Sequence, residues 1–348
     1  GFLPAGHDHG AARGFSLDHT ELVMTASVDP YFRGYFNLAL LDEEVEIEEA
    51  WVQTSSLGNG FSLKGGRFLS GLGYQNAQHP HAWDFADNNL MVRTLFGEAY
   101  GNDGVQLKWV APTELFLELG FEAGRGANFP GTDRNENSAG STALFGHLGG
   151  DVGDAHSWRA GLSYLQAKAR DRDGDLEDMG GVDAETLFTG TSKTWMADVV
   201  WKWAPSGNAA ERNFKFAAEY FRRSERGSLL CADNSADGGA CTGIEDAYRS
   251  RQSGFYAQGV YQFMPRWRTG YRYDRLDPGS VDFGVNNAFL PLSDYTPTRH
   301  SLMLDYAPSE FSRLRLQVAK DKSMESVSEN QWFVQYIHSL GAHGAHAF

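Results

Sequence analysis

The feature that most constrains this fold is a paired unit that recurs along the chain. In each unit, apolar and polar residues alternate over a segment of about 10 residues, a short turn reverses the chain, and a second alternating segment follows. A period of two residues is typical of a β-strand whose two faces meet different surroundings. The short turns contain Pro112, Pro205, Pro265 and Pro308. The connections between units are long and rich in Gly, Asp, Asn and Ser, and they comprise residues 124–139, 169–192, 225–248 and 277–297.

Short turns at one end and long loops at the other are typical of outer-membrane β-barrels. The sequence has 348 residues, which suits one large barrel or two soluble domains. No run of about 18 apolar residues occurs, so a transmembrane helix is excluded. Aromatic residues make up 13% of the chain and there are 40 glycines, which fits interfacial aromatic girdles and tight turns. We therefore predict an all-β protein in the bacterial outer membrane. Residues 1–348 would form one transmembrane antiparallel barrel with short periplasmic turns and long extracellular loops.

The last strand sets the expected strand number. Residues 331–340 alternate, with Trp332, Val334 and Tyr336 on one face, and the chain ends on the aromatic Phe348. A barrel must close because hydrocarbon offers no partner to an unpaired backbone group. We count fifteen candidate strands, the first over 16–28, whereas bacterial barrels have even strand numbers. We therefore expect a 16-strand barrel with one further strand before Gly1. The alternative is 14 strands, if the count is wrong by one.

Parts of the sequence resemble a known family. The segments are VDPYFRGYFNLAL, EEVEIEEAWVQTSS, FSLKGGRFLSGLGYQNAQHPHAWDF and the ending SLGAHGAHAF. They resemble porin-like outer-membrane β-barrel proteins, often labelled zinc-regulated TonB-dependent outer-membrane receptors. The order of these strands is more distantly similar to phosphate-selective porins O and P. A TonB-dependent receptor carries a folded plug, and the residues before Ser16 are too few for one. The resemblance therefore implies an unplugged barrel.

This resemblance implies a function and a set of partners. A porin-like barrel passes small polar solutes or ions and contacts outer-membrane lipid and lipopolysaccharide, and a homotrimer is one assembly that it allows. The formal net charge of −15 favours cations over nucleic acid as the attracted species. We therefore expect a passive, cation-preferring channel that also admits divalent metals. The alternative is a metal-binding receptor or structural barrel with an occluded lumen. The chain has no GxSxG, HExxH or phosphate-loop motif, so we expect no enzymatic activity.

Alternation predicts which charged side chains line the lumen. Acidic residues recur on early strands, as Glu44, Glu46 and Glu48 and then as Glu114, Glu118 and Glu122. Basic residues recur on late strands, as Arg266, Arg268, Arg272, Arg313 and Arg315. Walls of opposite charge would produce a transverse field that orients solutes and sets ion selectivity. The alternative is that these charges cancel in pairs and have no gating role.

The longest aperiodic segment is 70–103, which contains Tyr74, Trp83, Phe85 and Phe96. A segment with so many aromatic residues needs burial, and the nearest interior is that of the barrel. We predict that residues 70–103 fold into the lumen and form its constriction. The alternative is a lid packed on the outer rim.

Histidines and carboxylates suggest metal sites. His79 and His81 flank Pro80 and precede Asp84, and His7 and His9 lie near the start of the chain. Imidazole with carboxylate suits zinc or another divalent transition metal. These residues are therefore candidate ligands, the alternative being that they are ordinary loop residues.

Two further loop features suggest bound or covalent links. The carboxylate-rich run 171–178, DRDGDLED, is similar to a calcium loop, although Leu176 stands where an EF-hand needs glycine. Cys231 and Cys241 lie in a polar stretch and suit a disulfide in an oxidising compartment. A zinc pair is the weaker alternative for these cysteines, since no second pair of ligands lies nearby.

Overall fold

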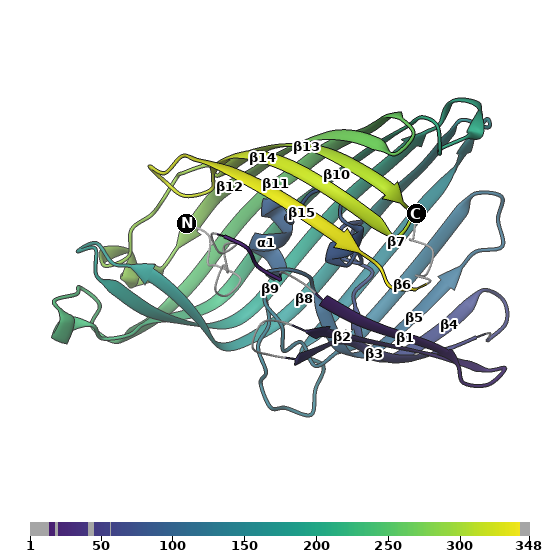
Figure 1. The fold of residues 1–348 in the computed structure, drawn as a ribbon. Helices are drawn as coiled ribbons and strands as arrows, with labels where there is room; N and C mark the ends of the chain where they lie inside the picture. The colour runs from purple at the N-terminus through teal and green to yellow at the C-terminus, as the bar shows by residue number, and fades with distance from the viewer. Residues whose placement is uncertain (1–13, 18–19, 41–44, 56, 342–348) are drawn as a thin grey trace.

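The protein is a barrel of antiparallel β-strands (Figure 1). The computed structural model describes residues 14–17, 20–40, 45–55 and 57–341. Each strand pairs with the next along the chain, so the described residues form one 15-stranded sheet in sequence order. The strands are β1 (Thr20–Ser27), β2 (Phe32–Leu40), β3 (Val45–Thr54), β4 (Phe61–Leu69), β5 (Gly101–Val110), β6 (Phe116–Gly124), β7 (Ser141–Val152), β8 (His156–Glu177), β9 (Asp183–Trp203), β10 (Asn213–Cys231), β11 (Ile244–Met264), β12 (Trp267–Asp282), β13 (Thr298–Ser309), β14 (Ser312–Lys322) and β15 (Glu329–His338).

The all-β antiparallel architecture predicted from the alternation is confirmed. The described residues form 15 strands, and the further strand that we expect before Gly1 falls outside them. Among the residues that the structure describes, the helices are short: one α-helix, α1 (Leu90–Phe96), and four 3-10 turns at Pro80–Ala82, Pro205–Gly207, Ser235–Asp237 and Gly284–Ala288. In the described ranges, no helix has both the length and the apolar character needed to cross a bilayer.

Strand β9 illustrates the two faces of the barrel wall. On one face Trp195 is 60% exposed and Val199 is 38% exposed, whereas Met196 and Val200 on the other face are buried. Because nothing in the sheet covers the first face, its apolar residues suit contact with lipid. The second face carries buried polar residues such as Asp198 and points into the barrel. The alternation seen in the sequence therefore separates residues that face lipid from residues that face the barrel interior.

The two ends of the barrel differ as the turn residues predicted. Pro112, Pro205 and Pro265 follow β5, β9 and β11, and Pro308 lies at the end of β13. Odd-numbered strands all end on the same side of an antiparallel sheet, so the four prolines mark one end. Cys231 ends β10 and forms a disulfide with Cys241 at the opposite end. The predicted disulfide is confirmed.

Two of the predicted long loops are mostly strand. Pairing between β8 and β9 continues to Glu177 and Asp183, and pairing between β10 and β11 continues to Cys231 and Ile244. The intervals 169–192 and 225–248 were predicted as loops because their apolar alternation fades. The backbone hydrogen bonds between the strands continue through these intervals. The apolar alternation fades because polar residues occupy the outward face as well as the inward face.

The run 171–178, which we predicted as a possible calcium loop, is also mostly strand. Residues 171–177 belong to β8, where Asp171 and Asp173 are exposed. An extended strand separates side chains on one face by about 6.6 Å, whereas calcium ligands lie about 2.4 Å from the ion. In the part of the chain that the structure describes, no group of three carboxylates converges in this run. Asp171 instead accepts a hydrogen bond from the Thr189 hydroxyl at 3.2 Å.

Asp178 joins two loops at the disulfide end. Its carboxylate accepts hydrogen bonds from the backbone N–H groups of Ala240 at 2.6 Å and Val182 at 3.1 Å, and from Asn234 Nδ2 at 3.0 Å. These hydrogen bonds lower the pKa of the Asp178 carboxyl to about 2, and the one from the Ala240 backbone N–H has the largest effect. The turn after β8 is thereby fixed to the loop that the disulfide closes.

Candidate pore constriction

Residues 70–100, between β4 and β5, lie against the inner side of the barrel wall, and we call them the inner loop. Figure 1 shows α1 within the barrel. Asn89 caps α1 by accepting a hydrogen bond from the Val92 backbone N–H at 2.9 Å. The inner loop and strands β7–β12 share one buried apolar cluster, which contains Leu72, Leu90, Met91, Val92, Leu95, Phe96 and Tyr100 from the loop and Ala143, Leu165, Met196, Phe221, Tyr256 and Leu276 from the wall.

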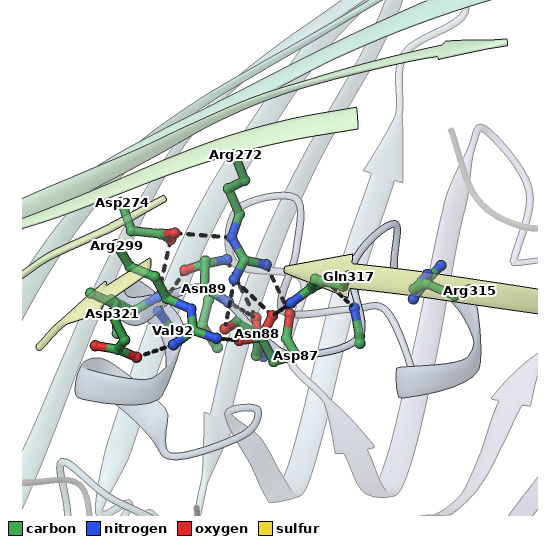
Figure 2. A network of polar contacts seen from close by, with 12 residues as sticks. Asp87, Asn88, Asn89, Val92, Arg272, Asp274, Arg299, Arg315, Gln317 and Asp321 are labelled. Carbon is green, nitrogen blue, oxygen red and sulfur yellow. Dashed lines mark hydrogen bonds and ion pairs between the residues drawn. The ribbon is translucent and has the colours of Figure 1, made fainter. Parts of the chain in front are cut away.

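Asp87 is the centre of a network of charges that holds the inner loop to β12–β14 (Figure 2). Arg272 Nη2 lies 3.0 Å from Asp87 Oδ1, and Arg299 binds the other oxygen. Gln317 Nε2 donates to Asp87 Oδ1 at 2.8 Å. Arg272 also pairs with Asp274, whose carboxylate accepts from the backbone N–H of Leu90 at 3.2 Å. The network therefore fixes the start of α1 as well as Asp87.

Asp84 makes a second anchor on neighbouring strands. Its carboxylate pairs with Lys215 on β10, lies 3.5 Å from Arg268 on β12, and accepts from Gln258 Nε2 at 3.0 Å. The preceding carbonyl, that of Trp83, accepts hydrogen bonds from Arg313 at 3.1 Å and Arg315 at 2.8 Å. Since buried charges cost free energy unless they are paired, these contacts make the docked position of the loop strongly preferred.

The start of the inner loop is held by acceptors on the wall. Glu122 on β6 accepts from the Ser70 hydroxyl and, at 3.0 Å, from the backbone N–H of Gly71. Glu219 on β10 accepts from the backbone N–H groups of Tyr74 at 2.7 Å and Gln75 at 3.1 Å. These carboxylates satisfy loop N–H groups that have no strand partner, which lets an irregular segment remain buried.

Histidines of the inner loop meet carboxylates of β1–β3. His79 Nδ1 lies 3.2 Å from Glu48 Oε2, and His79 Nε2 lies 2.9 Å from Glu49 Oε1. His81 Nδ1 lies 3.2 Å from Glu21 Oε2, and the two imidazoles stack with ring centres 5.9 Å apart. The inner loop therefore bridges the early strands and the late strands of the barrel.

The acidic ladder of β3 differs from the predicted one. Glu46 keeps the predicted side, opposite the buried Ala39. Asn37 then pairs with Glu49 and Leu38 with Ile47, so Glu48 is the extra residue of a β-bulge. A bulge shifts the alternation by one residue. As a result, Glu48 and Glu49 both point inward, where His79 meets them. Glu44 lies outside the described residues.

Other predicted lining residues divide into two groups. Glu118, Glu122, Arg268, Arg272, Arg313 and Arg315 point into the barrel and are paired there. Two predictions are wrong. Glu114 is exposed in the turn before β6, and Arg266 is exposed in the turn between β11 and β12 with a φ of 70°. Both predictions continued the two-residue period beyond the end of a strand. The period does not hold there, because the side chains of a tight turn point away from the wall.

The predicted metal ligands do not converge as one set. His79 and His81 lie together, but Asp84 is occupied by Lys215 and Arg268. His7 and His9 lie outside the described residues. The structure instead brings Glu21, Glu48 and His79 together, with one ligand atom of each lying within 4.8 Å of the others. Two of these three come from strands that the histidine motif did not suggest.

Several residues of the site were missed in the sequence. Arg299 and Asp305 alternate on β13 and face inward, so their spacing was a usable signal. Asp305 pairs with Arg268 and Arg315. Asp87 lies in an aperiodic segment, and nothing in its surroundings in the chain distinguishes it from other loop carboxylates. Only the folded chain brings it to Arg272 and Arg299.

Solved structures similar to this one are outer-membrane porins and channels. A loop-deletion mutant of OmpT from Vibrio cholerae matches with a TM-score of 0.55 and 13% identity, over 92% of this chain and 89% of that one. DcaP, an outer-membrane channel of Acinetobacter baumannii, matches with a TM-score of 0.52 and 15% identity, over 92% and 84% of the two chains. The anion-selective porin of Comamonas acidovorans matches with a TM-score of 0.52 and 9% identity, over 93% and 86%. The fold is thus that of a porin-like outer-membrane barrel.

A relative in sequence places the chain in a family. An uncharacterized protein of Aquifex aeolicus (strain VF5) is 32% identical over 362 aligned positions, which include 99% of this chain and 72% of the relative. The chain belongs to the same family as that protein. No protein-family profile matches the chain. These findings support the porin-like resemblance seen in the sequence, but they give no support to the zinc-regulated receptor label.

Proposed function

We propose that this protein is a passive channel of the bacterial outer membrane for small polar solutes or ions, with a preference for cations. The observation that carries the proposal is the docking of the inner loop inside a porin-like barrel. Its Asp84 and Asp87 pair with Lys215, Arg268, Arg272 and Arg299, so the loop neutralises much of the basic wall. The early wall keeps Glu21, Glu46, Glu48 and Glu49. A lumen with this balance favours cations, because local charge at a constriction governs selectivity.

The test is single-channel recording in a planar bilayer with the purified full chain. We expect stable conductance steps, and in a salt gradient we expect a reversal potential of the sign that cation preference produces. A reversal potential of the opposite sign would reject the cation preference but leave the channel. Absence of conductance from folded, inserted protein would reject the channel in favour of an occluded barrel that acts as a receptor or structural element. We expect transport without enzymatic chemistry.

We infer a second candidate function, the binding of a divalent metal that enters the lumen. Glu21, Glu48 and His79 supply one nitrogen and two oxygen ligands within 4.8 Å of one another. Asn37 lies in the same cluster, with Nδ2 2.8 Å from Glu48 and 3.3 Å from Glu21. Its side-chain oxygen is buried and has no hydrogen-bond partner. Mixed imidazole and carboxylate donors suit zinc and similar ions.

Calorimetric titration of the refolded chain with zinc tests this second function. We expect His79→Ala with His81→Ala, and separately Glu48→Gln, to weaken zinc binding at least tenfold. His300→Ala is the matched control, because His300 contacts Tyr271 and Tyr273 on the outward face. Equal binding by wild type and the triad variants, or no binding by wild type, would leave the cluster as a hydrogen-bonded brace between the inner loop and β1–β3.

We further infer that the channel forms a homotrimer. One of the similar structures is a trimer form of OmpT from Vibrio cholerae, with a TM-score of 0.55. Cross-linking of the refolded chain, read by the mass of the product before and after heating, distinguishes a trimer from a monomer. Only monomer under conditions that preserve conductance would reject the trimer without affecting the channel.

A further inference from the structure

The outward face of β9–β12 changes from aromatic to basic along the strands. Aromatic residues are outward in register on neighbouring strands, with Tyr220 opposite Phe255 and Trp195 opposite Tyr164. Towards the disulfide end, the next outward positions are exposed and basic. We call this group the outward basic patch, and it consists of Lys193, Arg222, Arg226, Arg249, Arg251 and Arg275.

The register places these positive charges close to one another. Arg226 on β10 lies directly opposite Arg249 on β11, and Ser224 lies between Lys193 and Arg251 on the two flanking strands. Side chains directly opposite in an antiparallel pair are about 5 Å apart at Cβ, and like charges there destabilise the sheet. An arrangement of this kind is stable when an external anion lies over it.

The surrounding chain supplies only part of that negative charge. Across the described ranges, none of the six side chains makes a hydrogen bond or an ion pair within contact distance. Asp282 is the register partner of Arg249 and interacts with it electrostatically, while its Oδ1 accepts from the Gly284 backbone N–H and from Asn287. Asp277 lies on the same strand as Arg275 and accepts from the Gly279 backbone N–H. The patch therefore retains an excess of positive charge on a protein whose net charge is −15.

The surface at the patch is hollowed. A depression of about 760 Å³ is lined by four basic residues, Lys193, Arg226, Arg249 and Arg251, and by two acidic ones, Glu225 and Asp282. Glu225 is already paired with Arg172, so the cations remain in excess. Neutral Gln166, Thr191 and Ser280 complete the lining. A second depression of about 320 Å³ lies beside Trp195, Arg222, Ser224 and Arg251. Guanidinium groups bind phosphate through two parallel hydrogen bonds, and the serine and threonine hydroxyls can donate to sugar or phosphate oxygens.

We propose that the outward basic patch binds the phosphorylated sugar headgroup of lipopolysaccharide. The inference rests on the placement in the outer membrane made under Proposed function. In such a barrel, aromatic girdles lie at the membrane interfaces, so cations one or two residues beyond the outer girdle lie at headgroup depth. The patch lies at the end with the disulfide and the longer connections, which is the extracellular end. Lipopolysaccharide is the phosphate-bearing lipid of that leaflet.

The experiment measures binding of rough lipopolysaccharide to the folded full chain in zwitterionic detergent, by native mass spectrometry and by fluorescence titration. The test variant is Arg226→Gln/Arg249→Gln/Arg251→Gln. The control variant is Arg125→Gln/Arg134→Gln/Arg170→Gln, which removes the same charge from arginines that are paired with Asp133 or Glu136. Heat-dependent gel mobility and single-channel conductance verify that both variants fold.

We expect the test variant to bind at least tenfold more weakly and the control variant to bind within twofold of wild type. We also expect dephosphorylated lipopolysaccharide to bind wild type as weakly as intact lipid binds the test variant. Equal affinity for both lipids, an unchanged test variant, or no binding by wild type would overturn the proposal. Competition by inorganic phosphate at concentrations equal to those of the lipid would instead assign a free-anion site. Conductance is measured separately, so a failure of the lipopolysaccharide proposal is distinguishable from a failure of the channel proposal.

Discussion

Asp87 of the inner loop and Arg272 of β12 form a buried ion pair, with Arg272 Nη2 3.0 Å from Asp87 Oδ1. Arg272 is 2% exposed at its side chain, and Arg299, which binds the other oxygen of Asp87, is 0% exposed. Removal of the Asp87 charge would leave both buried guanidinium groups without this partner. The pair therefore links the position of the loop in the lumen to the stability of the barrel wall.

Asp87→Asn should lower the free energy of unfolding by about 3 kcal/mol, because it leaves two buried cations with less compensation. The same variant should have larger and noisier conductance, since the start of α1 loses its anchor. Denaturant unfolding in detergent and single-channel recording measure the two effects. Asp237→Asn, an exposed carboxylate at the disulfide end, should change neither. An Asp87 variant with wild-type conductance would mean that the apolar cluster alone holds the loop.

Glu46→Gln combined with Glu118→Gln should reduce the cation-to-anion permeability ratio by about twofold or more, since it removes two inward negative charges. Removing the Glu118 charge also leaves the Lys108 ammonium, 2.8 Å away, without that partner. Reversal potentials in a salt gradient measure the ratio. Glu114→Gln is the matched control, because Glu114 lies in an exposed turn. An unchanged ratio in the double variant would show that these carboxylates do not set selectivity.

Cys231→Ser with Cys241→Ser should destabilise the loop between β10 and β11 by about 2–4 kcal/mol, the usual effect of a short disulfide loop. Both cysteines are fully buried in a cluster with Phe188, Tyr248 and Leu290. We expect faster proteolysis of residues 231–243 and unchanged conductance, because the inner loop contacts other parts of the wall. Protease digestion followed by mass spectrometry locates the cleavage. Cleavage in the inner loop instead would contradict this separation.

Asp178 should make the disulfide end sensitive to acid. Its hydrogen bonds to backbone N–H groups lower the folded-state pKa to about 2, below the usual value of about 3.9 for an unfolded Asp. A lowered pKa contributes stability above the unfolded value, and that contribution is lost as pH falls through the folded value. The hydrogen-exchange protection factors of residues 178–182 and 238–241, which are corrected for the intrinsic exchange rate at each pH, should therefore be high at pH 7 and fall between about pH 4 and 2. Asp178→Asn should give low protection factors at every pH. High protection in that variant would show that the carboxylate is not the link.

The sequence by itself determined the barrel. Alternation with a period of two, proline-containing short turns and the absence of an apolar helix were sufficient to predict strand order, both ends and the disulfide. This succeeds because lipid on one side and the interior on the other impose a residue type at every second position. The same rule failed at Glu114 and Arg266, where the strand ends, and at residues 171–177, where polar residues occupy both faces of a strand that continues.

Only the tertiary structure decided the site. The bulge at Glu48 turns two consecutive glutamates inward, and no local signal in a run of alternating Glu residues marks it. The partners of Asp84 and Asp87 lie on β10–β14, more than a hundred residues away in the chain, and they meet because the sheet curves around the loop. Lumen charges were predicted as two walls of opposite charge, whereas the inner loop places carboxylates directly on the basic wall. Which charge lies next to which depends on how the sheet curves, and a periodic pattern along one strand carries no information about it.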